Sequence, residues 1–196
     1  MNFVILAGGV GERLWPLGTP EKPKQFHALI GDEPMIVATV KRIPQAGDAL
    51  YFSTSAQYVA AIKSLFPKVQ DDHYIIEPAR RDTGPAMIHA AAQFMQRAPD
   101  EPLAFIPSDH LIKNTEQFLT TLRVGEALVR ETGHMVDIGV TAKFASTVLG
   151  YTHIGKKIEE RDGVVIYEFL GHTEKPDAKT AEQYLSSGEY LWHANY

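Results

Sequence analysis

The chain has 196 residues, a hydrophobic fraction of 44% and a formal net charge of −5. We predict a single domain spanning residues 1–196, because this length and composition supply a sizeable core. The acidic balance and the lack of a Lys/Arg-rich run argue against a nucleic-acid partner. No cysteine is present, which excludes disulfides and thiolate zinc sites. No apolar run is long enough to span a bilayer and no basic leader precedes one, so we expect a cytoplasmic protein without a membrane partner.

Short apolar segments alternate with helical patterns along the chain. The pattern predicts strands at residues 3–7, 49–53, 73–76, 103–107, 134–140 and 164–169. It predicts helices at residues 34–42, 56–66, 84–97, 115–131 and 178–187. This order indicates an α/β fold with a mostly parallel mixed sheet flanked by helices. Ligands of such sheets bind beyond the carboxyl ends of the strands, where Gly8, Glu77 and Asp109 are expected.

The glycine-rich turn after the first predicted strand is the most informative segment. Gly8, Gly9 and Gly11 allow backbone amides to approach phosphate oxygens, and Arg13 and Lys24 follow with positive charge. A Rossmann fingerprint would have glycine in place of the leucine at position 14, and no Gly-Lys-Ser/Thr sequence of a Walker A loop is present. The glycines alone are equally compatible with a tight strand-to-helix turn that binds nothing. The segment as a whole favours a nucleoside triphosphate site.

Several motifs resemble those of the sugar-1-phosphate nucleotidyltransferases, and most closely those of the mannose-1-phosphate guanylyltransferases. They are Leu-Trp-Pro-Leu at 14–17, Pro-Lys-Gln-Phe at 23–26, and the segments 77–86, 105–110, 150–151 and 174–176, in that order. The resemblance extends along the whole chain and implies the Rossmann-like nucleotide-diphospho-sugar transferase fold. It implies transfer of a guanylyl group from GTP to mannose-1-phosphate. A sugar-phosphate oxygen would attack the α-phosphorus in line, giving GDP-mannose and pyrophosphate.

The same resemblance assigns site residues. Arg13 would hold the leaving pyrophosphate, Lys24 would bridge phosphates, and Asp109 would bind Mg²⁺, which prefers carboxylate and phosphate oxygens. The nucleotide would contact Leu6, Ala7, Gly8, Gly9, Gly11, Glu77, Arg81 and Pro85. The sugar phosphate would contact Gly150, Tyr151, Glu174 and Lys175.

Each assignment has a structural alternative when its residues are taken alone. Asp109 could cap a loop, and Glu77 could end a strand rather than accept hydrogen bonds from guanine. Glu174 and Lys175 could be an exposed strand exit, and Tyr151 could pack with its hydroxyl in water.

Two segments depart from the family motifs. Asp82 replaces an asparagine. In residues 191–196, His193 and Asn195 both depart from the family pattern of Trp-Asn followed by a small residue and Gly. Because the chain stops within this motif, we expect a C-terminal truncation that removes a second metal carboxylate and a homo-oligomer contact. A regulatory relative that binds nucleotide sugars without catalysis, or a transferase for another base or hexose, stays open.

Overall fold

The computed structural model describes residues 1–9, 11 and 15–194. Its chain divides into two compact units, Met1–Thr115 and Glu116–Tyr196. The single domain that we expected from the chain length stays a prediction.

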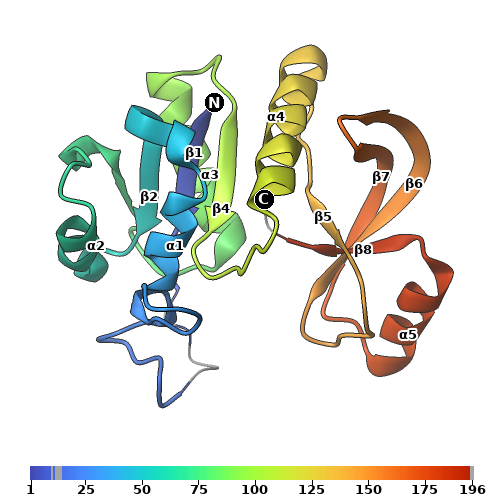
Figure 1. Ribbon diagram of the computed structural model, residues 1–196, viewed down its shortest axis with the longest axis horizontal. Helices are drawn as coiled ribbons and strands as arrows, with labels where there is room; N and C mark the ends of the chain where they lie inside the picture. Colours follow the sequence, from blue (N-terminus) through green and yellow to red (C-terminus); the bar gives the residue numbers. More distant parts are fainter. Residues whose placement is uncertain (10, 12–14, 195–196) are drawn as a thin grey trace. The chain divides into compact units, whose positions relative to one another are not determined.

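The first unit contains a parallel sheet with the strand order β3-β2-β1-β4 (Figure 1). The strands are β1 (Asn2–Leu6), β2 (Leu50–Thr54), β3 (Tyr74–Ile76) and β4 (Leu103–Pro107). Central β1 pairs in parallel with both β2 and β4. Strands that are covered on both faces are apolar along their whole length, which is why the sequence pattern located all of them to within a residue or so. Their carboxyl ends share one edge of the sheet.

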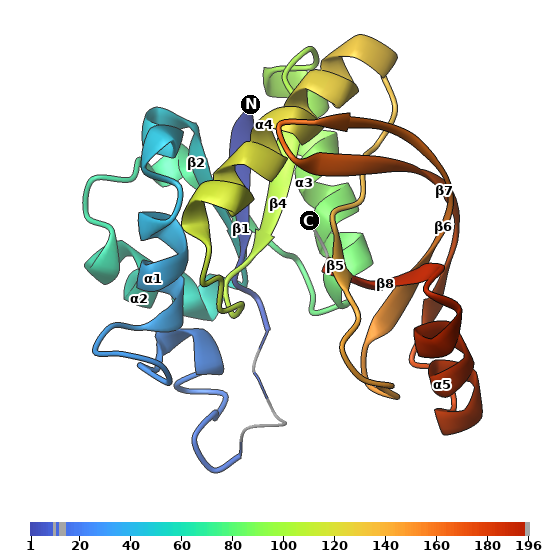
Figure 2. The same ribbon diagram turned by 45° about the vertical axis from the view of Figure 1, so that its right-hand side comes forward.

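Helices cover both faces of this sheet. They are α1 (Met35–Lys41), α2 (Val59–Leu65) and α3 (Thr83–Arg97), and Figures 1 and 2 show α1 and α3 on opposite faces. Val4 of β1 and Ile75 of β3 pack in one buried cluster with Ala90 and Phe94 of α3. Small residues such as Ala90 let a helix approach a sheet closely. The predicted helix at 56–66 begins with a short 3₁₀ turn before α2.

The second unit holds an antiparallel sheet with the strand order β5-β8-β6-β7. Its elements are α4 (Thr115–Thr132), β5 (Gly139–Thr141), β6 (Gly150–Arg161), β7 (Val164–Glu174), α5 (Ala178–Ser187) and β8 (Tyr190–His193). Figure 2 shows β6 and β7 as a long curved hairpin. Asp162 and Gly163 connect these strands with φ angles of 51° and 75°, the left-handed conformations that a tight hairpin turn requires. The Asp177 side chain caps α5 by accepting from the Thr180 amide at 2.7 Å.

The predicted α/β fold class is confirmed, with parallel and antiparallel pairing separated into two sheets. The predicted strand at 134–140 was wrong in its extent, because β5 begins only at Gly139. Its partner β8 is a short strand, so β5 pairs with it through Gly139, Val140 and Thr141 alone. The pattern missed β6 and β8. Charged residues alternate irregularly along β6, so its sequence shows no regular strand pattern. Its hairpin hydrogen bonds are made with β7, which lies later in the chain.

Candidate functional site

The glycine-rich loop follows β1 at the carboxyl edge of the parallel sheet, and a buried glutamine fixes its backbone. Gln25, which is 1% exposed, donates its side-chain amide to the carbonyls of Ala7 at 2.9 Å and Gly9 at 3.0 Å. Thr54 at the end of β2 donates to the same Ala7 carbonyl at 3.1 Å. The Ala7 amide in turn donates to the Ser53 carbonyl at 2.8 Å. The polar backbone atoms of Ala7 therefore hold the loop in place.

Two of the glycines are in contact with the side chains expected to bind the nucleotide. A Cβ atom added to Gly8 would lie 2.6 Å from Glu77 Oε1. Gly11 has a φ of +76°, and a Cβ there would lie 2.7 Å from Lys24 Cγ. A side chain at Gly11 would be strained by the positive φ and by the contact with Lys24, whereas a side chain at Gly8 would displace the carboxylate of Glu77. The structure thus brings Gly8 to Glu77 and Gly11 to Lys24.

Lys24 also forms an ion pair with Asp109, which follows β4. Both side chains are about one quarter exposed, at 25% and 24%. Ser108, just before the aspartate, donates its hydroxyl to the carbonyl of Leu6 at 2.8 Å and so joins the ends of β4 and β1. A cationic and an anionic group from distant parts of the sequence meet beside the glycine loop.

His110 lies next to this ion pair. Burial lowers the pKa of its imidazole, and the positive charges of Lys24 and Arg42 act in the same direction against the opposing effect of Asp109. Arg42 donates to the His110 carbonyl at 2.7 Å. The imidazole is therefore neutral near physiological pH and adds no charge to the edge of the sheet.

Glu77 is held at the end of β3. Its amide donates to the carbonyl of Thr54 at 2.9 Å, and its carboxylate accepts from the Ser53 hydroxyl at 3.0 Å. The expected nucleotide contacts Arg81 and Pro85 are exposed residues between β3 and the first turn of α3. The expected catalytic residue Arg13 lies outside the described residues.

The residues expected to bind the sugar phosphate lie in the second unit. Gly150 opens β6 opposite Glu174 at the end of β7. A Cβ at Gly150 would lie 2.6 Å from Glu174 Oε2 and 2.7 Å from His172 Cε1. Lys175 Nζ lies 2.6 Å from Glu174 Oε1, and this hydrogen bond is the main cause that lowers the pKa of the glutamate. The structure therefore brings these three expected residues together.

Tyr151 lies inside the second unit. Its side chain is fully buried, and its hydroxyl accepts from the amide of Ser146 at 2.8 Å. Its ring packs edge-on against Tyr184, with centroids 5.3 Å apart. A sugar contact at this position would have to use the backbone rather than the phenol.

Sequence reasoning gave no role to Gln25, or to three residues that form a polar cluster around Glu174 and Thr152 in the second unit: Asp137, His172 and His193. In that cluster His193 Nδ1 lies 2.8 Å from Asp137 Oδ1, and Thr152 donates to Asp137 Oδ2 at 2.5 Å. His172 Nε2 lies 3.5 Å from Glu174 Oε2. The one sequence signal that could have indicated this cluster is that His193 departs from the family motif. The other residues of the cluster are far apart along the chain, so no local pattern joins them.

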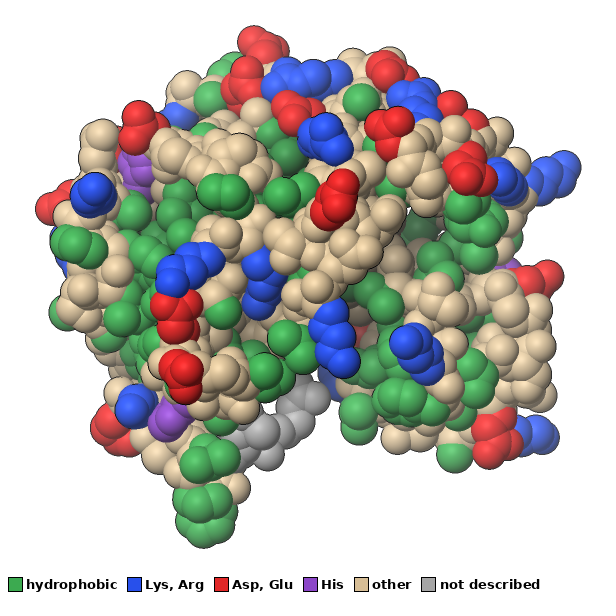
Figure 3. All heavy atoms as spheres, viewed as in Figure 1, with side chains coloured by type: hydrophobic (Ala, Val, Ile, Leu, Met, Phe, Trp, Pro, Cys, Tyr) green, Lys and Arg blue, Asp and Glu red, His purple; other side chains and the backbone are tan. Residues whose placement is uncertain are grey.

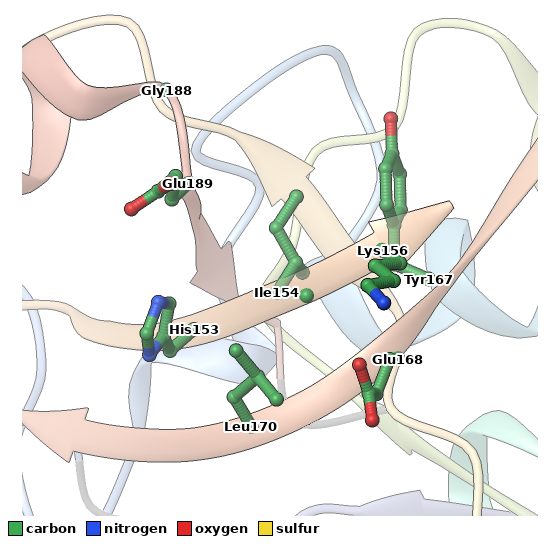
Figure 4. A pocket seen from close by; sticks show the side chains of 9 residues that line it. His153, Ile154, Lys156, Tyr167, Glu168, Leu170, Gly188 and Glu189 are labelled. Carbon is green, nitrogen blue, oxygen red and sulfur yellow. The ribbon is translucent and has the colours of Figure 1, made fainter. Parts of the chain in front are cut away.

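A separate pocket lies against the β6–β7 hairpin. It measures about 520 Å³, and Figure 4 shows the side chains that line it. Register shifts in the β6–β7 pairing, of the kind that bulges produce, bend the hairpin here. The lining carries the carboxylates of Glu168 and Glu189 but only one lysine, Lys156. This charge balance disfavours a polyphosphate, and none of the expected site residues lines it.

Asp109 provides an oxygen ligand of the type that Mg²⁺ prefers. Among the described residues, no group of three or more His, Asp or Glu side chains is arranged to hold a metal ion. A Mg²⁺ ion typically takes one or two protein carboxylates and completes its coordination with phosphate oxygens and water. Lys24, which pairs with this carboxylate, would have to give up part of that contact.

Two surface features bear on other partners. On the face in Figure 3, basic and acidic side chains are interspersed without a broad basic area among the described residues. The expected lack of a nucleic-acid partner stays a prediction. In residues 1–9, 11 and 15–194, no helix has the length and apolar character needed to cross a membrane.

Comparison with known proteins assigns the chain to a family. The profile of the Nucleotidyl transferase family matches residues 2–196. The chain belongs to the nucleotidyl transferase family. The resemblance inferred from the sequence motifs is thereby confirmed at the level of the family, and so is the Rossmann-like fold.

Two curated relatives of this nucleotidyl transferase are mannose-1-phosphate guanylyltransferases. The protein from Escherichia coli is 32% identical, over 97% of this chain and 42% of the relative. That from Salmonella muenchen is 35% identical, over 97% of this chain and 40% of the relative. The chain thus spans about two fifths of the length of these relatives.

A solved structure supports the fold. A protein described as a mannose-1-phosphate "geranyltransferase" from Thermus thermophilus matches with a TM-score of 0.83 and 27% identity. The match covers 98% of this chain and 55% of that protein. A putative glucose-1-phosphate thymidylyltransferase from Bacillus anthracis, at 16% identity and a TM-score of 0.65, shows the fold alone.

Proposed function

We propose that the chain is the substrate-binding part of a mannose-1-phosphate guanylyltransferase, which makes GDP-mannose and pyrophosphate from GTP and mannose-1-phosphate. The observation that carries the proposal is the Lys24–Asp109 ion pair beside the glycine loop. It joins a cation for phosphate oxygens and a carboxylate for Mg²⁺ at the edge of a parallel sheet where ligands bind. The names of the relatives supply the substrates.

The proposed reaction needs charge stabilisation and positioning more than acid–base chemistry. An oxygen of the sugar phosphate attacks the α-phosphorus of GTP, and the bond from that phosphorus to the bridging oxygen of pyrophosphate breaks. Lys24 binds phosphate oxygens as negative charge shifts to the leaving group, with Arg13 assigned the same task by resemblance. Mg²⁺, held by Asp109, would supply neutralising charge at the phosphates.

We propose that Glu77 recognises the guanine base. A carboxylate accepts from both the N1–H and the exocyclic amine of guanine, whereas uracil and adenine do not present that pair of donors. The contact of Glu77 with Gly8 and Ser53 keeps the carboxylate beside the glycine loop. In the second unit, we propose that Glu174 accepts from hexose hydroxyls and Lys175 binds the phosphate.

A regulatory relative without catalysis is the second candidate, because His193 replaces the asparagine of the family motif after Trp192. Pyrophosphate release by the full-length protein with Mg²⁺ separates the two. We expect turnover with GTP and mannose-1-phosphate to exceed turnover with ATP, UTP or other hexose-1-phosphates. A preference for UTP would overturn the assignment of Glu77. No release with any pair of substrates, although nucleotide still binds, would favour the regulatory role.

A further inference from the structure

Two histidines of the second unit lie between two carboxylates beside the expected sugar-phosphate residues. His193 on β8 contacts Asp137, with Nδ1 2.8 Å from Oδ1, and both of these atoms are shielded from solvent. His172 on β7 lies 3.5 Å from Glu174. The two imidazole rings meet edge-on, with centroids 4.6 Å apart. We call these four residues the imidazole cluster.

The cluster lies at the start of β6. A Cβ at Gly150 would touch both His172 and Glu174. Thr152, two residues further along β6, donates to the carboxylate of Asp137. The imidazole cluster is therefore continuous with Gly150, Glu174 and Lys175, the three residues that the proposed function assigns to the sugar phosphate.

Both carboxylates of the cluster are ionised near neutral pH. Burial opposes the ionisation of Asp137, but hydrogen bonds from His193 and Thr152 outweigh it and lower the pKa of the carboxyl group. The Lys175 ammonium, followed by His172, lowers the pKa of Glu174. Among the described residues, the imidazoles thus contact two negative carboxylates, and the positive Lys175 pairs with the other carboxylate oxygen of Glu174.

The net charge that an anion would meet at this site depends on how many protons the two imidazoles carry. With both imidazoles neutral, Asp137, Glu174 and Lys175 leave the site with one negative charge, which repels a phosphate. One proton on the imidazole pair makes the site neutral and a second makes it positive. A phosphate group nearby favours the protonated imidazole, as any neighbouring negative charge does. Binding of a phosphate here would therefore be linked to proton uptake.

We propose that His172 and His193 are further binding residues of the sugar-phosphate site, and that a hexose-1-phosphate binds together with a proton on this pair. The proposal rests on the proposed function for its ligand. Asp137 is a positioning residue, because it contacts His193 rather than the ligand. Replacement of the family asparagine by His193 then exchanges a neutral hydrogen-bonding group for an imidazole, which can carry a proton.

The steady-state test compares the full-length wild-type protein with His193→Asn and His172→Gln. Between about pH 6 and about pH 8, where imidazole titrates, we expect the KM for mannose-1-phosphate to rise roughly tenfold more in the wild type than in His193→Asn. The KM for GTP should follow the same pH profile in both proteins. The ionisation of the sugar phosphate itself is common to all the variants and cancels in the comparison. His134→Asn, which changes an exposed histidine of the same unit, should behave as wild type.

A second measurement does not depend on turnover. NMR titration of the full-length protein with inorganic phosphate should move the midpoint of the His193 titration upward by about one pH unit. An unchanged midpoint, together with equal KM profiles in wild type and His193→Asn, would overturn the inference even if the enzyme is active. A shifted midpoint in a protein that releases no pyrophosphate would support the inference and sink the proposed function instead.

Discussion

The two sets of candidate residues are held in place by different kinds of contact. Around the glycine loop of the first unit, buried side chains bond to backbone carbonyls, as Gln25 does to Ala7 and Gly9. Around Gly150 in the second unit, ionisable side chains contact one another, as Asp137 and His193 do. The contacts of Gln25 involve no titratable group, so this part of the loop does not change with pH. The arrangement in the second unit depends on which of its groups carry protons.

Under the proposed function, this difference implies that the two sets of residues have different tasks. A triphosphate needs a rigid binding loop, because the α-phosphorus must be held in line with the attacking oxygen of the sugar phosphate. A sugar phosphate that arrives beside two carboxylates needs its charge balanced when it binds. Changes in the first unit should therefore alter turnover and folding at every pH, whereas changes in the second should have effects that depend on pH.

The largest effect is expected at Asp109. Asp109→Asn keeps the size of the side chain but removes the charge that pairs with Lys24 and that would bind Mg²⁺. Loss of one preorganised electrostatic group typically lowers turnover by about 10²- to 10³-fold. Pyrophosphate release measured on the folded full-length protein checks this. Asp71→Asn, which removes an exposed carboxylate paired with Lys63, is the matched control and should retain activity. Unimpaired turnover of Asp109→Asn would exclude the residue from the reaction.

Gln25→Leu tests whether the glycine loop is held by its backbone contacts. The substitution is similar in volume but removes both donors, and it leaves the Gly9 carbonyl without the partner it has here. A buried polar group that loses its partner costs about 1–3 kcal/mol. Urea unfolding should show that loss of stability at acidic and neutral pH alike. The exposed Gln57 serves as a control, since Gln57→Leu should change stability by less than about 0.5 kcal/mol. Equal unfolding midpoints for both variants would contradict a role for Gln25 in fixing the loop.

The smallest effect, and the one that depends on pH, is expected at Asp137. Because the folded-state pKa of this carboxyl is lowered, its contribution to stability is present above the unfolded pKa of about 3.9 and is lost as pH falls through the folded value. Asp137→Asn should therefore cost about 1 kcal/mol at neutral pH. The deficit relative to wild type should shrink below about pH 3, measured by urea unfolding at both pH values. A deficit that is the same at both would show that shape, not charge, makes the contribution.

The sequence alone determined the parallel half of the fold and several of the residues that the structure brings together around the glycine loop. The apolar runs of β1 and β4 are buried on both faces, so composition reveals them without knowledge of their partners. Gly8 and Gly11 indicate close approach because glycine alone tolerates it, and parallel strands bring their carboxyl ends to one edge of a sheet. Local chemistry and one topological rule were sufficient there.

Only the tertiary structure decided the antiparallel half and the imidazole cluster. The pairing of β6 with β7 and β8 is set by register between strands, and no single-strand pattern encodes it. Asp137 and His172 carry no signal as separate residues, and His193 is marked only by its departure from the family motif. They become a site only when the fold of the second unit brings them within contact distance. The effect of one charged side chain on another depends on the distance that the fold sets between them. The conformational preference of a glycine arises from its own backbone and can be recognised in the sequence.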